Sequence, residues 1–557
     1  MNRLFWVLKA MMLYVFLGSL QLHAQSLPVG TPVLEDAYRR AQLLGQIDSS
    51  ISFTSRPFYP KTITPTGKNL EQNRLLKNYL PTSDTLLRFI NNKGIVQLLP
   101  ITWFQQYNSD HPAGMNDGIM IPARGYQTLF SAGIFAKFGP LSIQLEPEVV
   151  YAENKAFEYK TYKDIPYNSN IDILYADYRA GIDLPERFGN SSYHKISWGQ
   201  SSIRLTFGPI SFGLSNENLW WGPGIYNSLL MTNNAPGFEH FTINTVTPIR
   251  TPIGSFEGQL IGGRLDGSGF SPSKPDDWRY LNGTIITYQP RWVPGLFLGV
   301  TRTYQVYHKD MGNGITDYLP VLNAITKQAS GGNSQDAGKS QDQVASFFMR
   351  WLWTKEKGEI YFEYGREDHA WNLRDLITEP TSSAAYILGL RKAILLNKLK
   401  NEYIQVNMEV TQLEMDNITL NRIGGSWYVH YPILHGYTNR GQVLGAGIGP
   451  GSNLQTINIS WNRKLVMIGL QFDRYVHDND FFQKYIKDIR SNWVDLSEAL
   501  VCNWQYKNIL LNSKIAVIRS KNYKWQYAPN LSYPQLFWNS THDVYNIQGQ
   551  LGITYRF

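Results

Sequence analysis

Residues 544–557 read VYNIQGQLGITYRF, and their side chains alternate between apolar and polar. One parity, broken only by Gly549, carries Tyr545, Ile547, Leu551, Ile553, Tyr555 and Phe557. The other carries Asn546, Gln548, Gln550, Thr554 and Arg556. Strict alternation predicts a β-strand with one apolar and one polar face. Its length suits a tilted strand that crosses a membrane, which needs about 9–11 residues. The alternative is an edge strand of a soluble β-sandwich.

The beginning of the sequence predicts export. Residues 1–26 have the pattern of a secretory signal peptide, with Arg3 and Lys9, the apolar stretch 10–17 and the imperfect cleavage site Leu22-His23-Ala24. No run of 18 or more apolar residues follows, so we expect no transmembrane helix. An exported chain with period-two strands is then a soluble periplasmic or secreted fold, or a barrel.

Composition favours the barrel. Aromatic residues make up 14% of the chain, with 34 Tyr and 16 Trp, yet the mean hydropathy is −0.30. Many amphipathic rings in a chain that is not apolar overall are typical of barrels with lipid-facing strands and aromatic girdles. The single cysteine, Cys502, cannot form an internal disulfide. The net charge of +8 fits acidic glycans or lipid phosphates outside, and equally fits lumenal Lys and Arg.

A near-repeat marks two hairpins, FGPLS at residues 138–142 and FGPIS at residues 207–211. Gly-Pro between alternating runs is a turn signal. Such short connections alternate with long polar stretches, at 152–193, 216–239, 265–280, 308–343, 369–384, 414–453, 477–495 and 520–542. Outer-membrane barrels show this pattern, with periplasmic turns and external loops, and their last strand likewise closes on an aromatic residue.

Counting strands back from Phe557 gives about 17, beginning near Gly125, and Ile95 to Tyr107 adds one more. The predicted fold is therefore an all-β transmembrane barrel of about 18 antiparallel strands over residues 95–557. The stretch 414–453 leaves open whether it holds a further hairpin.

Residues 27–94 differ from the barrel region. Leu34, Ala37, Tyr38, Ala41 and Leu44 fall at helical spacing. Residues 69–79 and 84–92 read similarly, the latter with Ser83 or Asp84 as N-cap and Gly94 beyond its end. We expect a small α-helical subdomain on the periplasmic side.

The most distinctive loop, residues 216–237, holds a Trp pair, a Gly-Pro-Gly turn and paired asparagines. Aromatic faces suit the C–H side of sugar rings, and amides and carboxylates suit hydroxyls. The predicted polysaccharide-binding residues are Asn216, Glu217, Trp220, Trp221, Asn233 and Asn234. The alternative is that the tryptophans pack a loop folded into the lumen. Further candidates are the basic Lys274, Arg279, Lys309, Lys327, Lys339 and Arg440, and the aromatic Trp278, Tyr280, Trp371, Trp427, Tyr428, Trp525 and Trp538, whose other role is an interfacial girdle.

This loop carries a family resemblance. WWGPG at 220–224, NNAP at 233–236, TPIG at 251–254 and the stretch 86–103 resemble the capsule assembly Wzi family of outer-membrane proteins. The resemblance implies a monomeric 18-stranded barrel with a periplasmic helical bundle. We also expect contact with outer-membrane lipid and lipopolysaccharide. The resemblance also implies a non-catalytic, lectin-like attachment of exported capsular polysaccharide. The alternatives are a passive channel for small solutes and an outer-membrane enzyme.

Signals for catalysis and cofactors are weak. Ser540 and His542 share one face of an extended strand, whereas Asp543 lies on the other. His430 with His435, and residues 478–480, lack a complete metal-ligand set. No phosphate-binding loop or RNA-binding motif occurs. We therefore predict no enzyme activity, no cofactor, no metal and no nucleic-acid partner.

Overall fold

The computed structural model describes residues 25–60, 85–90, 94–157, 178–271, 274–312, 314–322, 341–367, 373–378, 380–416, 425–486, 488–527 and 543–557. The signal peptide and the helix expected at 69–79 lie outside these ranges. So do Lys327, Lys339, Trp371, Trp538, Ser540 and His542.

One large antiparallel sheet forms the wall of the molecule. Its first part contains β3 (Gly94–Leu98), β4 (Ile101–Asn108), β5 (Gly125–Ser131), β6 (Ile134–Phe138), β7 (Leu141–Leu145), β8 (Glu148–Ala152), β9 (Tyr193–Ser197), β10 (Ser202–Phe207), β11 (Ile210–Ser215), β13 (His240–Thr245) and β14 (Ile249–Thr251). Several of these strands continue one another after a short break, as β3 and β4 do around Pro100.

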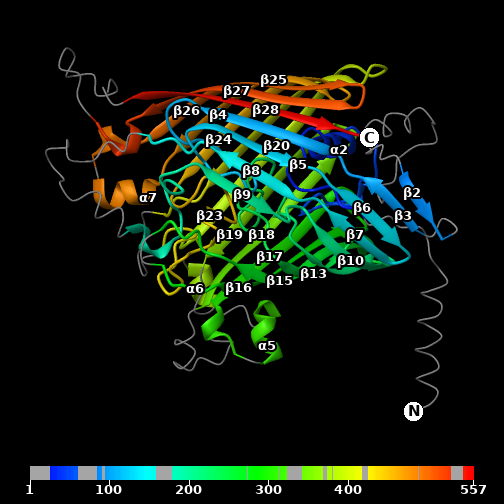
Figure 1. The fold of residues 1–557 in the computed structure, drawn as a ribbon, viewed down its shortest axis with the longest axis horizontal. Helices are drawn as coiled ribbons and strands as arrows, with labels where there is room; N and C mark the ends of the chain where they lie inside the picture. Colours follow the sequence, from blue (N-terminus) through cyan, green and yellow to red (C-terminus); the bar gives the residue numbers. More distant parts are fainter. Residues whose placement is uncertain are drawn as a thin grey trace.

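The second part consists of longer strands. They are β15 (Gly254–Leu265), β16 (Arg279–Pro290), β17 (Leu296–Tyr307), β18 (Gln341–Trp353), β19 (Gly358–Glu367), β20 (Ala384–Asn397), β21 (Glu402–Gln412), β24 (Asn453–Arg463), β25 (Val466–Val476), β26 (Val494–Tyr506), β27 (Ile509–Lys521) and β28 (Val544–Tyr555). From β15 onward each strand pairs with the next wall strand in the sequence. The last strand, β28, also pairs with β4, with Gln550 opposite Gln106. The pairing therefore returns to its starting region, and Figure 1 shows the tilted strands surrounding a common interior.

The strand at residues 544–557 has the predicted alternation. Tyr545 and Ile547 are 59% and 53% exposed, whereas Asn546 and Gln548 are buried. The apolar face therefore points outward and the polar face inward, the reverse of a soluble sandwich. This arrangement is the one expected of a barrel wall that meets lipid.

The two predicted Gly-Pro hairpins are confirmed. Phe138 pairs with Leu141, and Phe207 pairs with Ile210. Both turn glycines adopt a φ of 56°, a left-handed conformation that a glycine accepts without a steric penalty. Short turns lie at one end of the barrel, beside α2 and the C-terminus, and the long connections lie at the other, beside α7 (Figure 1).

The first predicted helix is present as α2 (Leu34–Leu43). Its side chains reach deep into the turn end of the barrel, where Arg39 and Arg40 are buried. Two-residue strands β1 (Ser55–Arg56) and β12 (Trp220–Trp221) then pair this segment with the Trp loop. Residues 25–60 thus occupy the lumen end.

The helix predicted at 84–92 is wrong. Residues 85–89 form β2 (Thr85–Phe89), which pairs antiparallel with β3. The stretch has apolar side chains at 86, 87, 89 and 90, a run that suits either structure locally. Pairing with the backbone of β3 outweighs the helix signal, because it satisfies the hydrogen-bonding groups of both strands.

The uncertain stretch 414–453 holds a small hairpin, β22 (Thr438–Asn439) with β23 (Gln442–Val443). It forms a separate two-stranded sheet and adds nothing to the wall. The other short helices are η3 (Arg179–Gly181), η4 (His308–Asp310), α5 (Ile315–Tyr318), η5 (Pro320–Leu322), α6 (Leu373–Thr378), α7 (Asn479–Phe481), η7 (Phe482–Ile486), η8 (Ile489–Ser491) and η9 (Tyr523–Trp525). Within the described ranges, every helix is too short or too polar to cross a membrane.

The two faces of β28 should respond differently to charge. We expect Leu551→Arg, on the outward face, to cost about 2 kcal/mol or more near the bilayer midplane. Gln550→Arg, the matched control on the inward face, should cost much less. Heat-modifiable migration on gels and the yield of assembled protein measure the effect. Equal assembly of both variants would contradict the assignment of the outer face.

Candidate functional site

Inner segments fill much of the described lumen. They are the N-terminal segment (residues 25–60), the Trp loop (residues 216–239) and the 425–452 loop. A continuous apolar cluster joins Trp221 and Leu229 of the Trp loop to Trp427 and Tyr428 of the 425–452 loop. It also includes inward side chains of the wall, such as Tyr361.

A row of carboxylates on β19 holds these segments. Glu359, Glu363 and Glu367 are four residues apart, so all three point into the lumen. Near the turn end, Glu359 accepts hydrogen bonds from Arg39 of α2 at 2.9 Å and from Arg350 of β18 at 2.8 Å. An ion pair of this kind, shielded from water, ties α2 to the wall.

The next two carboxylates hold the loops. Glu363 accepts from the backbone N–H of Leu229 at 3.3 Å, and Glu367 accepts from the backbone N–H of Tyr428 at 2.9 Å. Glu409 on β21 accepts from the backbone N–H of Ile225 at 2.7 Å. Wall carboxylates therefore supply the acceptors that loop backbones need once they leave water.

The Trp pair is interior. Trp220 and Trp221 are 4% and 0% exposed. The Arg56 guanidinium lies 4.3 Å from the centre of a Trp220 ring, and Trp221 Nε1 donates to Gln259 Oε1 at 2.9 Å. Their ring faces are covered in this conformation. The geometry therefore favours the packing role that the sequence left open.

Glu217, Asn233 and Asn234 of the predicted set each bond to a different part of the interior. Glu217 is buried and pairs with Arg204 at 2.6 Å. Asn233 Nδ2 donates to the carbonyl of Asn116 at 2.8 Å, and Asn234 Nδ2 donates to the carbonyl of Val443 at 3.0 Å. Asn216 is half-buried. The six residues brace inner loops, and their contact with polysaccharide stays a prediction.

Among the other loop candidates, some are buried and others keep part of the side chain accessible. Arg279 is buried and donates to the carbonyls of Gly436 and Thr438, at 2.7 and 2.8 Å. Trp278 remains half-buried and stacks on His308, with ring centroids 4.4 Å apart. Burial lowers the pKa of Lys274 to about 8. Trp278 is thus one of the few predicted platforms with an accessible ring.

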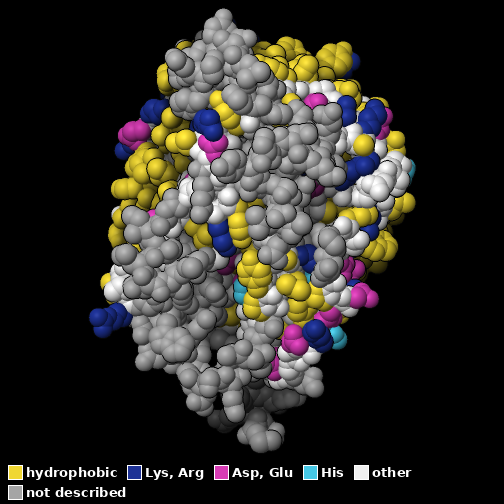
Figure 2. Space-filling model, turned by 90° about the vertical axis from the view of Figure 1, so that its left-hand side faces the viewer, with side chains coloured by type: hydrophobic (Ala, Val, Ile, Leu, Met, Phe, Trp, Pro, Cys, Tyr) yellow, Lys and Arg dark blue, Asp and Glu magenta, His cyan; other side chains and the backbone are white. Residues whose placement is uncertain are grey.

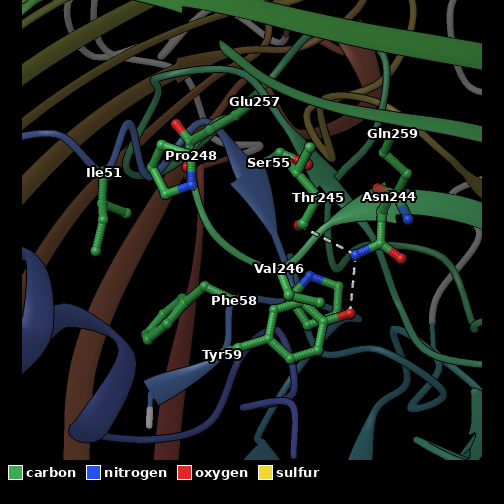
Figure 3. Close-up of a pocket in the computed structure, with 11 residues that line it drawn as sticks. Ile51, Ser55, Phe58, Tyr59, Asn244, Thr245, Val246, Pro248, Glu257 and Gln259 are labelled. Atoms are coloured by element: carbon green, nitrogen blue, oxygen red, sulfur yellow. Dashed lines mark hydrogen bonds between the residues drawn. The ribbon is translucent and has the colours of Figure 1, made fainter. Parts of the chain in front are cut away.

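Two cavities lie between the inner segments and the wall. The larger, which we call the inner chamber, has a volume of about 280 Å³ and is lined in part by Gln25, Ser26, Glu146, Glu148 and Asn233. The smaller holds about 30 Å³, room for roughly one water. In Figure 3, Tyr59 of the N-terminal segment points toward Asn244 of β13 across this smaller cavity, and their hydrogen bond is 3.0 Å long. Neither cavity is large enough for a polymer.

A third cavity, the loop-end cleft, has a volume of about 180 Å³ and lies at the end with long connections. Its lining combines aromatic with charged side chains: Phe157, Arg179, Glu186, Tyr475, His477, Asp478, Trp493, Tyr523, Lys524 and Trp525. Figure 2, which looks onto this end, shows charges of both signs mixed with apolar and polar groups.

An aromatic stack forms one side of the cleft. The rings of His477 and Trp493 are nearly parallel, with centroids 3.7 Å apart. Tyr475 lies 3.8 Å from His477 on centroids, and the buried Trp525 supports Trp493 edge-on at 5.2 Å. Tyr475, His477 and Trp493 are only half-buried, so part of each ring faces the cleft.

Asp495 fixes this stack. Its carboxylate accepts from Trp493 Nε1 at 3.0 Å and lies 2.8 Å from His477 Nε2. On the opposite side, Lys524 pairs with Glu186 at 2.6 Å. The cleft therefore offers fixed ring faces beside groups that exchange hydrogen bonds with hydroxyls.

Acidic residues complete the cleft. Burial and the neighbouring Asp480 raise the pKa of Asp478 to about 7. Among the residues described, no cluster of three His, Cys, Asp or Glu could hold a metal ion. A half-protonated carboxyl near neutral pH can both donate to and accept from a hydroxyl.

Sequence reasoning missed most of this cleft. It selected Trp525 as a possible platform but not Tyr475, His477, Trp493 or Tyr523. An available signal was the concentration of aromatic residues in and around the predicted loops 477–495 and 520–542. A pocket built from several loops becomes visible only when the strands are paired.

Together these features define an antiparallel β-barrel with an apolar outer face, a largely occupied lumen and an aromatic cleft among its long loops. The family model described as capsule assembly protein Wzi matches residues 123–494, more than half of the chain. The chain therefore belongs to the Wzi capsule assembly family.

A solved structure agrees with this fold. The chain is similar to Escherichia coli Wzi, described as an outer membrane protein involved in group 1 capsule assembly and a carbohydrate-binding β-barrel. The identity is 13%, the match covers 96% of this chain and 100% of that one, and the TM-score is 0.63. Pseudomonas aeruginosa OccK8 (OprE) matches at 8% identity over 84% and 99%, with a TM-score of 0.40. No curated protein matches the chain.

Because the Trp pair is buried, we expect its removal to lower the stability of the folded barrel. Trp221→Ala should leave a cavity and destabilise the folded barrel by about 3–5 kcal/mol. Trp278→Ala, which removes a half-buried ring, should cost less. The midpoint temperature of heat-modifiable migration distinguishes them. If both variants melt alike, Trp221 does not pack as described.

Asp478 makes a pH prediction. Because its pKa is raised from 3.8 to about 7, the folded state holds a proton that the unfolded state releases above pH 4. Stability should therefore fall as pH rises from about 4 to about 7 and change little above that. We expect the melting midpoint to drop from pH 5 to pH 7, and to drop less in Asp478→Asn. An equal drop in both proteins would exclude Asp478 as the titrating group.

Proposed function

We propose that this protein attaches or organises capsular or related surface polysaccharide at the outer face of the outer membrane, by binding and without catalysis. Membership of a capsule assembly family supports this proposal. The proposal rests mainly on the loop-end cleft, where half-buried aromatic side chains lie beside charged groups. Such a combination suits sugar rings, which are apolar on one face and carry hydroxyls at their edges.

The proposal includes a closed membrane barrel. If interrupted strands such as β3 with β4 and β13 with β14 are each counted once, and β2 is left out, the strands described would make a wall of five interrupted and thirteen continuous strands, eighteen in all. Short turns then face the periplasm and the cleft faces outward. Export would follow from a cleaved signal peptide, and the lipid contacts would include outer-membrane lipopolysaccharide. We propose a monomer.

Binding would depend on repetition along the polymer. A sugar residue would lie against the parts of Tyr475 and Trp493 that face the cleft, and its hydroxyls would reach Asp478 or Lys524. One such contact is worth on the order of 1 kcal/mol per ring. Many barrels engaging one chain would raise the overall avidity. The six predicted residues of the Trp loop would contribute indirectly, by bracing the loops from within.

The channel alternative has less support. The Trp loop and the 425–452 loop pack together across the described lumen, and the N-terminal segment occupies its turn end. A passive channel needs a continuous wet path, and the inner chamber between these segments holds only about 280 Å³. A low conductance in planar bilayers would agree with binding as the function.

The aromatic stack provides the direct test. We expect Trp493→Ala to assemble normally and to bind purified capsular polysaccharide several-fold more weakly, because one ring face is lost. Cells carrying this variant should shed capsule into the medium. The matched control is Trp278→Ala, which removes a Trp that also stacks on a histidine but lies outside the cleft.

Binding assays on the purified barrel should accompany capsule staining of whole cells. Normal migration with unchanged binding in Trp493→Ala would reject the cleft as the binding site. An equal loss of polysaccharide binding in Trp278→Ala would indicate instead that binding is spread over all the loops.

A further inference from the structure

The inner chamber gathers more negative charge than its described surroundings balance. Glu146 and Glu148 line it, and Glu217 lies beside it. Glu217 has a cation partner in Arg204, at 2.6 Å. Glu146 and Glu148 receive hydrogen bonds from the neutral amides of Gln144 and Gln200, at 3.3 and 3.0 Å. Among the described residues, neither carboxylate has a Lys or Arg within ion-pair distance.

Gln25, the residue that follows the predicted cleavage site, belongs to the lining of the same chamber. Gln25 and Ser26 are each 4% exposed and both line the chamber. The Ser26 hydroxyl donates to Gln144 Oε1 at 3.2 Å and also bonds to Glu217. Gln144 in turn bonds to Glu146, so Ser26 is connected to two of the three carboxylates. The buried Gln25 Oε1 has no hydrogen-bond partner.

We propose that Gln25 is the N-terminus of the processed chain and that its α-ammonium group is the missing cation of this chamber. The inference rests on the export and cleavage proposed above, and the sequence Leu22-His23-Ala24 places the scissile bond directly before Gln25. Water hydrolyses that amide bond. The leader leaves with the Ala24 carboxylate, and the Gln25 nitrogen takes up a proton to become an ammonium.

Position and charge both support the assignment. Consecutive Cα atoms are about 3.8 Å apart, so the new ammonium stays within one residue of Ser26 and its carboxylate network. A buried carboxylate without a counter-charge is costly, whereas a hydrogen-bonded ion pair offsets that cost. Processing would therefore supply a stabilising charge inside the lumen, and the N-terminal segment would be held most firmly after cleavage.

The first experiment examines the N-terminus of the protein purified from outer membranes. Mass spectrometry should show a chain that starts at Gln25 with a free amine. An amine-reactive reagent should leave this amine unmodified in the folded barrel and modify it after unfolding. The exposed Lys398 and Lys400 serve as internal controls, since they should react in both states.

Three outcomes would overturn the proposal: a different first residue, labelling of the amine in the folded barrel, or cyclisation of Gln25. In cyclisation the α-nitrogen attacks the side-chain amide carbon and releases ammonia, which leaves a neutral lactam and no cation.

The second experiment uses the sign of a stability change. With one ammonium present, one of the two variants, Glu146→Gln or Glu148→Gln, breaks the ion pair and should lower the melting midpoint. Without it, the same changes remove an unpaired buried charge and should raise the midpoint. Glu356→Gln, at an exposed turn, is the control and should leave the midpoint unchanged. An unchanged or raised midpoint in both chamber variants would reject the ion pair. None of these measurements involves a glycan, so they can fail while polysaccharide binding stands.

Discussion

Polar groups enclosed by a lipid-facing wall must find partners within the protein, and this requirement governs the interior. The wall strands turn their apolar side chains outward, so their polar side chains converge on the lumen. The carboxylate row on β19 then needs donors. Arg39, the backbone N–H of Leu229 and the backbone N–H of Tyr428 supply them at three successive levels. The inner segments are therefore part of the folded barrel, because their removal would leave buried charges unpaired.

This constraint explains why the most distinctive motif is structural. A Trp pair beside Gly-Pro-Gly brings large apolar rings and a tight turn into a space that is otherwise lined by polar groups. Trp221 fits against Gly283 of β16, where a side chain would meet its ring at 2.9 Å. The Trp loop thus contributes packing, and its backbone contributes the donors that Glu363 and Glu409 require. Sugar recognition is better served by rings that remain partly open.

The sequence predicts the wall well, because apolar and polar side chains alternate wherever one face of a strand meets lipid and the other meets polar groups. The Gly-Pro turns and the inward parity of β28 are of this kind. The sequence predicts structure poorly where long-range pairing decides. Residues 85–89, expected to be helical, form a strand because β3 lies beside them. The sequence does not predict the cleft, for a related reason. Tyr475 and Trp493 are separated by the loop that holds α7, and they meet through His477 only once β25 and β26 are paired.

The loop-end cleft depends little on either the lipid-facing wall or the enclosed polar lumen. Its rings stand above the lipid-facing strands, and its stack depends on one local acceptor, Asp495, rather than on the lumenal network. Changes to Trp493 or Lys524 therefore alter what the cleft binds with little effect on the wall. Changes to Glu363 or Trp221 disturb packing throughout the lumen. Under the proposed function, this separation lets the side chains of the cleft change while the interior is kept.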